Sequence, residues 1–526
     1  MSILEAIAAL ACVCLIAHGL LLLNNGLYWD GWILDAWQRT RDWKTMHRFF
    51  SETGMPILYY QHRAMAALPF RLFAYKLLGF VSLLASAIFV FLIAHRVAHI
   101  PIHDALLLSG LVLVYPGQQM LVEPVISLNY MLPVALFLAA CLLALEAIAH
   151  DARIAAPLQI TALILFFVSF NMNSLLVLYW GFMAGLIAAA ISRGVHDAPR
   201  EWVEFVPFAV FAVWPFAYWT CKERLTPRHG EYKDYNRLNL APRQLGLGLL
   251  NLWRDGMLGV TVDALRLRTP AHASVFLAGM AVLTTLVLPF TDPSPHFGSI
   301  LVASGLLSAV LAAVPYIVVG QLFARSGWAT KNNILLCIPF GLVIIGVGHL
   351  SGHRIALAAV IGVIASASIT HLIRSYLIWL GITARHHSVL MHLARKPEVA
   401  ESSIVIVRDP DNTFAFANGD QPVVYTTHML TSVFGSTSRL MAVQRTRSRY
   451  LPEQAVAAIK ATTIEYGLTR IDPRGPQILV HINDRHTSAP RLGFQALLHR
   501  HLSRQAETTF LLGLTCVRFE HPVAHS

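Results

Sequence analysis

Residues 4–23 read LEAIAALACVCLIAHGLLLL and are followed directly by residues 24–37, NNGLYWDGWILDAW. The first stretch has the length of a membrane-spanning helix, which needs about 20 mostly apolar residues. No basic segment precedes it, so we expect a retained helix rather than a secretory signal. The second stretch holds Asp30 and Asp35 among three tryptophans. Because a charged side chain is costly in hydrocarbon, this junction indicates a hydrated site at a membrane surface.

The composition of the whole chain agrees with a membrane location. Of 526 residues, 56% are hydrophobic and only 13% are charged, and the mean hydropathy is +0.57, whereas soluble domains carry roughly 25% charged residues. The sequence therefore predicts an all-α polytopic membrane protein with about eleven transmembrane helices. The expected spans are residues 3–23, 70–94, 104–118, 127–149, 156–171, 174–192, 203–220, 271–290, 298–320, 334–350 and 354–380.

The chain is basic, with a formal net charge of +11. Its basic residues lie in segments between apolar runs, so we expect membrane lipids or a phosphorylated substrate as partners, and no nucleic acid. The six cysteines lie mostly inside apolar runs and indicate neither a disulfide framework nor a metal pair. The absence of an HExxH pattern and of a Walker loop argues against a histidine-based metal site and against nucleotide-driven transport. The cofactor stays open: the pattern allows a divalent metal ion but does not indicate one.

Positive charge in short loops predicts the orientation. If the N-terminus is cytoplasmic, the short inner loops hold Arg96, Arg153, Arg193, Arg200 and Arg354, while the outer loops YPGQQMLVEPVIS and NMNS hold no Lys or Arg. This arrangement follows the positive-inside rule. It places residues 24–69, residues 221–270 and everything after about 385 on the outer face.

Two domains are expected. Residues 1–385 form the transmembrane domain, and residues 386–526 form a connecting helix followed by a small C-terminal α+β domain, because the composition becomes ordinary from residue 402 onward. We expect strands at VVYTT, QILVHI and FLLGLTCVRF, and a helix over 451–467. The purpose of this domain stays open.

The first outer loop predicts two surface helices. Residues 30–50 alternate aromatic and basic side chains at loose helical spacing, which is typical of an amphipathic helix lying on a membrane. A second helix follows Pro56 and brings together His62 and Arg63. Asp35 lies five residues after Asp30, about 140° round a helix, so the two carboxylates should not point at one target.

Three carboxylates are candidates for catalysis: Asp30, Asp35 and Glu123. Asp30 receives more weight than Asp35, and its simplest alternative role is to cap a helix. Glu123 is the only acidic residue of its short outer loop, where the alternative is a solvated surface glutamate. Together, one carboxylate could act as general base and the other could orient the acceptor or hold a metal ion.

The order of these features resembles the GT-C superfamily of membrane glycosyltransferases. The features are one span, a long outer loop of two surface helices that begins with an Asp, a short outer loop with a carboxylate, a multi-span body and a C-terminal outer domain. Where that family has an acidic pair of the form DD, DE or ExD, this chain has WDGW at 29–32. The resemblance implies inverting transfer of a sugar from a polyprenyl phosphate donor to a glycan, lipid or protein acceptor, with Asp30 as the base.

The departing phosphate of such a reaction needs positive charge. The outer loops offer His62, Arg63, Lys222, Arg224, Arg228, Arg325 and Lys331. Each could instead be a snorkelling or topology-setting residue.

Two other functions fit the same pattern. An O-antigen ligase or polysaccharide polymerase would use residues 221–270, whereas a transporter or flippase would carry ionisable residues at the centre of several spans, and these spans are almost free of them. The absence of an N-x-[ST] sequon favours a bacterial inner membrane, with the C-terminal domain on the periplasmic side.

Overall fold

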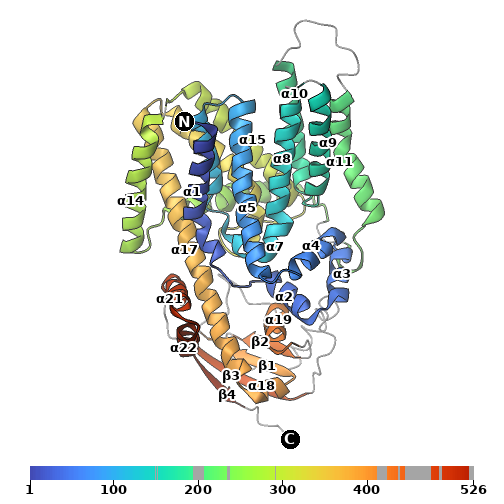
Figure 1. Ribbon diagram of the computed structural model, residues 1–526, viewed down its shortest axis with the longest axis vertical. Helices are drawn as coiled ribbons and strands as arrows, with labels where there is room; N and C mark the ends of the chain where they lie inside the picture. Colours follow the sequence, from blue (N-terminus) through green and yellow to red (C-terminus); the bar gives the residue numbers. More distant parts are fainter. Residues whose placement is uncertain are drawn as a thin grey trace.

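The computed structural model describes residues 1–148, 150, 152–192, 206–233, 237–290, 292–410, 423–435, 439–444, 475–484 and 488–520. It combines an upright helical bundle with a small sheet domain at one end (Figure 1). The predicted class, a polytopic helical protein with a C-terminal α+β region, is confirmed.

Seven helices among the described residues are long and apolar enough to cross a membrane, fewer than the eleven predicted. They are α1 (Ile3–Leu22), α5 (Arg71–Leu92) with η1 (Ile93–Val97), α7 (Pro124–Ile126) with η3 (Ser127–Met131) and α8 (Leu132–Ala147), α14 (Pro270–Val287), α15 (Pro295–Ile317), η8 (Trp328–Leu336) with α16 (Cys337–Leu350), and α17 (Arg354–Ala394).

The other four predicted spans are also helices of the bundle, and the described apolar parts of three of them are shorter than 18 residues. They are α6 (Ile102–Leu113), α9 (Ala152–Ser169), α10 (Leu175–Ser192) and α11 (Val206–Leu225). Helix α6 has only 12 residues, and α11 contains Pro215 and ends with Lys222 and Arg224 in its last turn. The apolar composition therefore predicted these helices of the bundle, although their described parts fall short of the length or the hydropathy of the seven spans.

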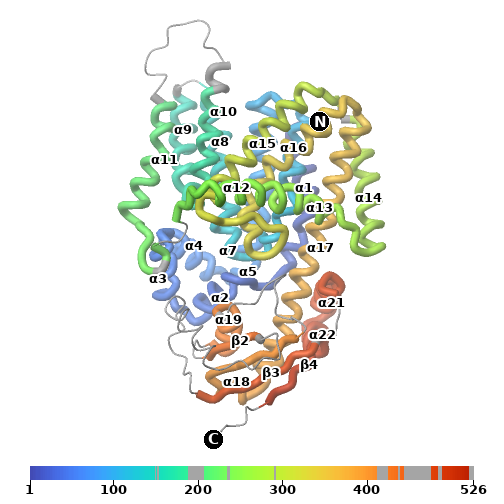
Figure 2. The backbone as a smooth tube through the Cα atoms, turned by 180° about the vertical axis from the view of Figure 1, so that it is seen from behind, coloured from blue at the N-terminus to red at the C-terminus, as the bar shows by residue number. Residues whose placement is uncertain are grey.

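The first loop and the C-terminal domain lie at the same end of the bundle, opposite the N-terminus (Figure 1). The segment after α11 reaches this end as well, because the His229 backbone N–H donates to the Glu52 carbonyl, next to η5 (Gly230–Tyr232). Beyond it, α12 (Pro242–Asn251), η6 (Leu252–Met257) and α13 (Leu258–Leu265) lie across the upright helices (Figure 2).

The first loop contains three short helices rather than two. The single helix predicted over 30–50 is wrong, because α2 (Asp30–Thr40) ends at Arg41, which has a left-handed φ of 55°. Asp42 then accepts the Thr45 backbone N–H at 3.1 Å and begins α3 (Trp43–Glu52). A short acidic side chain at this position caps the new helix and competes with continuation of the old one. The predicted helix after Pro56 is confirmed as α4 (Pro56–Ala66).

The C-terminal domain is built around a four-stranded sheet in the order β2-β1-β3-β4. Strand β1 (Ile404–Arg408) pairs in parallel with β2 (Leu440–Gln444) and β3 (Gln477–Asp484), and β4 (Thr515–Glu520) is antiparallel to β3. Its helices are α18 (Pro397–Glu401), α19 (Val423–Phe434), α21 (Ala489–Leu502) and α22 (Arg504–Leu514). The expected connecting helix is the end of α17, which runs unbroken from the bundle.

Two strand predictions in this domain are wrong. VVYTT begins α19, and FLLGLTCVRF is divided between α22 and β4, whereas QILVHI is a strand as predicted. In α19 the Thr426 hydroxyl donates to the Met441 carbonyl, and the Thr427 hydroxyl accepts the Met441 N–H at 3.1 Å. These contacts with β2 favour a helix despite its β-branched residues. The helix predicted over 451–467 lies outside the described residues.

Candidate functional site

Asp30 is the first residue of α2 and lies at a sharp backbone turn. The preceding residue, Trp29, has a positive φ of 34°, which is unfavourable for a large side chain. Its indole is held between Trp328 and Trp379, with ring centroids 5.7 and 5.0 Å away. Strained backbone of this kind concentrates at functional sites. The turn leaves Asp30 half-buried, where it accepts a hydrogen bond from the Tyr425 hydroxyl at 3.1 Å.

Glu123 lies directly behind the first turn of α2. A Cβ added to Gly31 would lie 2.6 Å from Oε1 of Glu123, so the missing side chain of Gly31 makes room for this carboxylate. Glu123 is completely buried, and so is Lys76. The Lys76 ammonium donates to the Val122 carbonyl, one residue before Glu123, and to the Gly26 carbonyl at 3.4 Å. The structure therefore brings Asp30 and Glu123 together, with Lys76 beside the deeper acid.

Both carboxylates have perturbed pKa values. Burial raises the pKa of Asp30, whereas the charge of Lys331 and the hydrogen bond from Tyr425 oppose that rise. Burial also raises the pKa of Glu123 well above its usual range; Lys76 opposes this, and the negative charge of Asp30 adds to it. A half-buried carboxylate with a raised pKa is suited to accept a proton, because its basicity is greater than that of a solvated Asp.

Asp35, the third predicted catalytic acid, belongs to a different cluster. It forms an ion pair with Arg39 at 2.6 Å and a second one with Arg71. It also accepts the Ser432 hydroxyl at 2.9 Å. Since its oxygens bind these three donors, Asp35 connects α2 to the start of α5 and to α19, and does not lie with Asp30 and Glu123.

The two predicted phosphate ligands of α4 have different surroundings. His62 is fully buried: its Nδ1 lies 2.7 Å from the Tyr75 hydroxyl and its ring stacks on Phe50 with centroids 5.1 Å apart. Burial lowers the pKa of His62 to about 3, so it stays neutral and packs as a core residue. Arg63 is exposed and donates to the Tyr59 hydroxyl at 2.9 Å.

The basic residues in the last turn of α11 and just after it are dispersed. Lys222 is buried and donates to the Asn173 side-chain oxygen at 2.6 Å. It lines a mostly apolar pocket of about 210 Å³ between α4, α8, α9 and α11. Arg224 is exposed, and Arg228 packs against Gly54 of the first loop.

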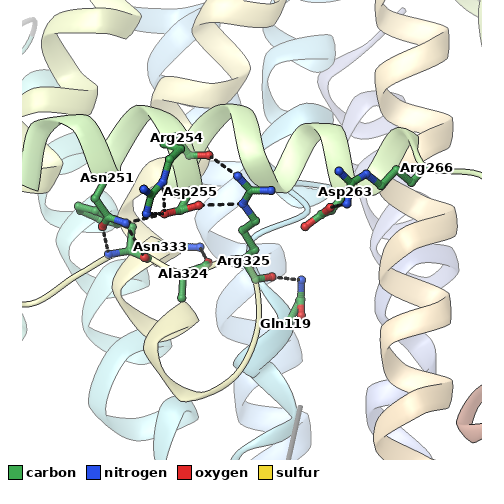
Figure 3. Close-up of polar contacts among 10 residues, drawn as sticks. Gln119, Asn251, Arg254, Asp255, Asp263, Arg266, Ala324, Arg325 and Asn333 are labelled. Carbon is green, nitrogen blue, oxygen red and sulfur yellow. Dashed lines mark hydrogen bonds and ion pairs between the residues drawn. The ribbon is translucent and has the colours of Figure 1, made fainter. Parts of the chain in front are cut away.

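Arg325 and Lys331 lie in the same predicted loop but differ in their partners. Arg325 forms an ion pair with Asp255 at 2.8 Å, and Asp255 also binds Arg254 at 2.6 Å (Figure 3). The Gln119 side chain donates to the Arg325 carbonyl at 2.9 Å, which ties the Glu123 loop to this network (Figure 3). Lys331 instead lies 4.2 Å from the centroid of the Trp328 ring and acts on the charge of Asp30.

Sequence reasoning did not identify Lys76 or Tyr425. The signal for Lys76 was available, because an ionisable residue inside an apolar span such as RLFAYKLLGF is a functional candidate by default. Tyr425 carries no local signal, since it lies 395 residues from Asp30 in the chain.

The described residues contain no group of three or more His, Cys, Asp or Glu side chains that could hold a metal ion. The charged residues that influence one another at the site are two carboxylates, Asp30 and Glu123, and two lysines, Lys76 and Lys331. No family model, curated protein or solved structure matches the chain.

Proposed function

We propose that the protein is a membrane glycosyltransferase that moves a sugar from a polyprenyl-phosphate donor to an acceptor at the end of the bundle that carries the C-terminal domain. The observation that supports this proposal most strongly is the position of Asp30. This half-buried carboxylate lies where a helical bundle meets a soluble domain, with a second acid behind it and lysines from two other segments nearby.

Each residue has its own role in the proposed reaction. Asp30 accepts the proton of an acceptor hydroxyl while that oxygen attacks C1 of the sugar. The bond between C1 and the phosphate oxygen breaks, and the lipid phosphate leaves with the electron pair. Lys331 lies near enough to Asp30 to act on its charge, and it is the best placed cation to stabilise the departing phosphate. Glu123 is completely buried and cannot touch a substrate, so it is a positioning residue.

A lipid-linked donor also needs an apolar surface for its lipid chain. The pocket of about 210 Å³ between α4, α8, α9 and α11 is a candidate for this surface, because its lining is mostly hydrophobic and includes Leu132, Leu136 and Phe167 of the bundle. Lys222 provides a cation in the lining of this pocket. This arrangement suits a lipid chain with a charged headgroup.

The test is transfer by purified Asp30→Asn with a defined polyprenyl-phosphate sugar in detergent. We expect a loss of at least about 100-fold, since general bases contribute roughly 10²–10⁴ to a rate, while thermal unfolding stays close to that of the wild type. Asp292→Asn is the matched control, because Asp292 is exposed and forms an ion pair with Arg354, the first residue of α17. Undiminished transfer by Asp30→Asn would remove Asp30 from the mechanism.

The same assay separates the transferase from a ligase that uses residues 221–270. A ligase predicts that Arg224→Gln and Arg228→Gln abolish product formation while Asp30→Asn is tolerated. We expect the reverse order, because Arg224 is exposed and Arg228 packs against the first loop. We further propose that the membrane is a bacterial inner membrane and that the C-terminal domain faces outward.

A further inference from the structure

A second cavity, of about 840 Å³, lies between the first loop and α19. Its volume is in the range of sites that bind small molecules. The cavity is lined by Gln38, Arg39, Arg41, Trp43, Arg63, Ala66, Ala67, Arg71, Ser432, Val433, Phe434 and Gly435. Four arginines from three helical segments therefore face one space.

The charge of this lining is only partly neutralised. Asp35 pairs with Arg39 and Arg71. Arg63 binds a neutral hydroxyl and lies 5.7 Å from the Trp43 ring centroid. Among the described residues, neither Arg63 nor Arg41 forms an ion pair with a carboxylate. Two guanidinium groups that form no ion pair among the described residues favour an anionic ligand. The planar arrangement of their N–H donors matches the oxygens of a phosphate or a carboxylate.

This cavity is separate from the Asp30 site. Asp30 and Gly31 are at the start of α2, whereas Gln38, Arg39 and Arg41 are at its end. At 1.5 Å per residue, the two ends of this helix are about 15 Å apart. A single phosphate cannot contact both places.

The surroundings of the cavity narrow the class of ligand. Trp43 and Phe434 add aromatic surface to the arginines, a combination suited to a sugar ring that carries an anionic group. Close to Ala66, Ala67 and Arg71 of the lining, Leu68 and Phe70 are 45% and 76% exposed. Exposed apolar residues at the beginning of a spanning helix are expected at a lipid surface, so a ligand anchored in the membrane can reach this opening.

We propose that this cavity is a second anion site, which binds the phosphate-bearing headgroup of a glycolipid acceptor or of a membrane phospholipid about 15 Å from Asp30. The inference rests on the proposed function only in calling the glycolipid an acceptor. Arg41 and Arg63 bind the anion, and Arg39 and Arg71 remain paired with Asp35.

The experiment measures binding to the full-length protein in phosphatidylcholine nanodiscs, without any transfer reaction. Glucose 6-phosphate is the soluble probe, and glucose is its uncharged counterpart. A second arm measures retention of phosphatidylglycerol by native mass spectrometry. Both arms compare the wild type with the double variant Arg41→Gln/Arg63→Gln, and with Lys44→Gln, which removes an exposed charge of the same loop outside the cavity lining.

We expect the wild type to bind the phosphorylated probe and not glucose, and the double variant to bind it at least about 10-fold more weakly, with Lys44→Gln unchanged. If the double variant loses only the retention of phosphatidylglycerol, the result supports the site and assigns it to phospholipid. Equal binding by the wild type and the double variant in both arms overturns the proposal. Asp30→Asn should bind the probe normally, so failure of the transferase function would leave this result unaffected.

Discussion

The ionisation of Asp30 is governed by neighbours that can be removed one at a time. Burial raises its pKa, while Lys331 and Tyr425 oppose that rise. Lys331→Met should therefore raise the pKa further. Because a base works only when deprotonated, the acid limb of the pH profile of transfer should move to higher pH. Tyr425→Phe should shift it in the same direction by less, since only one hydrogen bond is lost.

Lys44→Met serves as the control for this profile, because it removes an exposed lysine of the first loop. The profile is measured as the initial rate of transfer from pH 5 to pH 9. A limb that moves to lower pH in Lys331→Met contradicts the assignment of Asp30 as the base.

Gly31 is the residue whose size the site restricts most directly. In Gly31→Ala the new Cβ would lie 2.6 Å from the Glu123 carboxylate, so that group has to move. We expect a destabilisation of about 1–3 kcal/mol, together with reduced transfer. Thermal unfolding and initial rates measure the two effects. Gly110→Ala is the control, since nothing lies within 4 Å of a Cβ at that position.

Shortening the opposing acid tests the cause of this effect. Gly31→Ala/Glu123→Asp should unfold at a higher temperature than Gly31→Ala alone, because the shorter side chain leaves space for the added methyl group. If the second substitution lowers stability further, the clash with Glu123 is not the cause.

Sequence reasoning at this scale identified Asp30 and Glu123 as a pair and gave Asp30 more weight than Asp35. The five-residue spacing of Asp30 and Asp35 in a helix predicted that their side chains point in different directions. Asp35 does form a separate ion-pair cluster. The charge of Lys222, Arg224, Arg228 and Arg325 could be read from the sequence, but their partners could not. Arg325 pairs with Asp255, and these residues are 70 positions apart in the chain.

Among the elements, α17 and α21 approach one another most closely where each has a glycine. A Cβ on Gly493 would lie 1.9 Å from the Leu377 carbonyl oxygen, and one on Gly381 would lie 2.2 Å from the Ala489 carbonyl oxygen. Gly493→Ala should separate the helices and destabilise the protein by at least about 1–3 kcal/mol, because backbone atoms cannot rotate away. The measurement is amide hydrogen exchange over 489–502 together with thermal unfolding.

Gly513→Ala is the matched control for this contact. It lies in the neighbouring α22, and a Cβ there would meet nothing within 4 Å. Unchanged exchange in Gly493→Ala would show that α21 does not depend on this approach.

At the scale of elements, local signals succeeded where they were specific. Pro56 marked the start of α4, and the run QILVHI became β3 as predicted. They failed where distant contacts decided the outcome. VVYTT has strand propensity, but its threonine hydroxyls bind β2 and it folds as α19. The break at Arg41 has a local cause instead, because Asp42 caps α3, but this signal was not separated from the pattern of a continuous amphipathic helix.

Across the whole molecule, the C-terminal domain completes the candidate site. Helix α19 supplies Tyr425 to Asp30 and Ser432 to Asp35, and it forms one wall of the second cavity. The sequence left the purpose of this domain open. These contacts join residues nearly 400 positions apart, a separation that composition and periodicity cannot bridge.

Two buried histidines make the stability of this assembly dependent on pH. The ring of His428 on α19 packs edge-on against Trp37 of α2, and His62 lies in the core of the first loop. Burial lowers the pKa of each to about 3 from an ordinary value of 6.5. Between these values the unfolded chain binds more protons than the folded protein. Stability is therefore full above pH 6.5 and falls as the pH decreases, by about 1.4 kcal/mol per pH unit for each histidine.

His428→Phe should remove about half of this pH dependence. Neither ring nitrogen of His428 has a hydrogen-bond partner among the described residues, so an apolar ring of similar shape costs little at pH 7. Thermal unfolding at pH 7, 6 and 5 measures the slope, and His296→Gln, at an exposed position, should leave it unchanged. A slope in His428→Phe equal to that of the wild type would mean that His428 is already hydrated or protonated in the folded state.

Because α19 carries Tyr425, the wild type should also lose transfer below pH 6.5 together with this contact, and His428→Phe should retain transfer to lower pH.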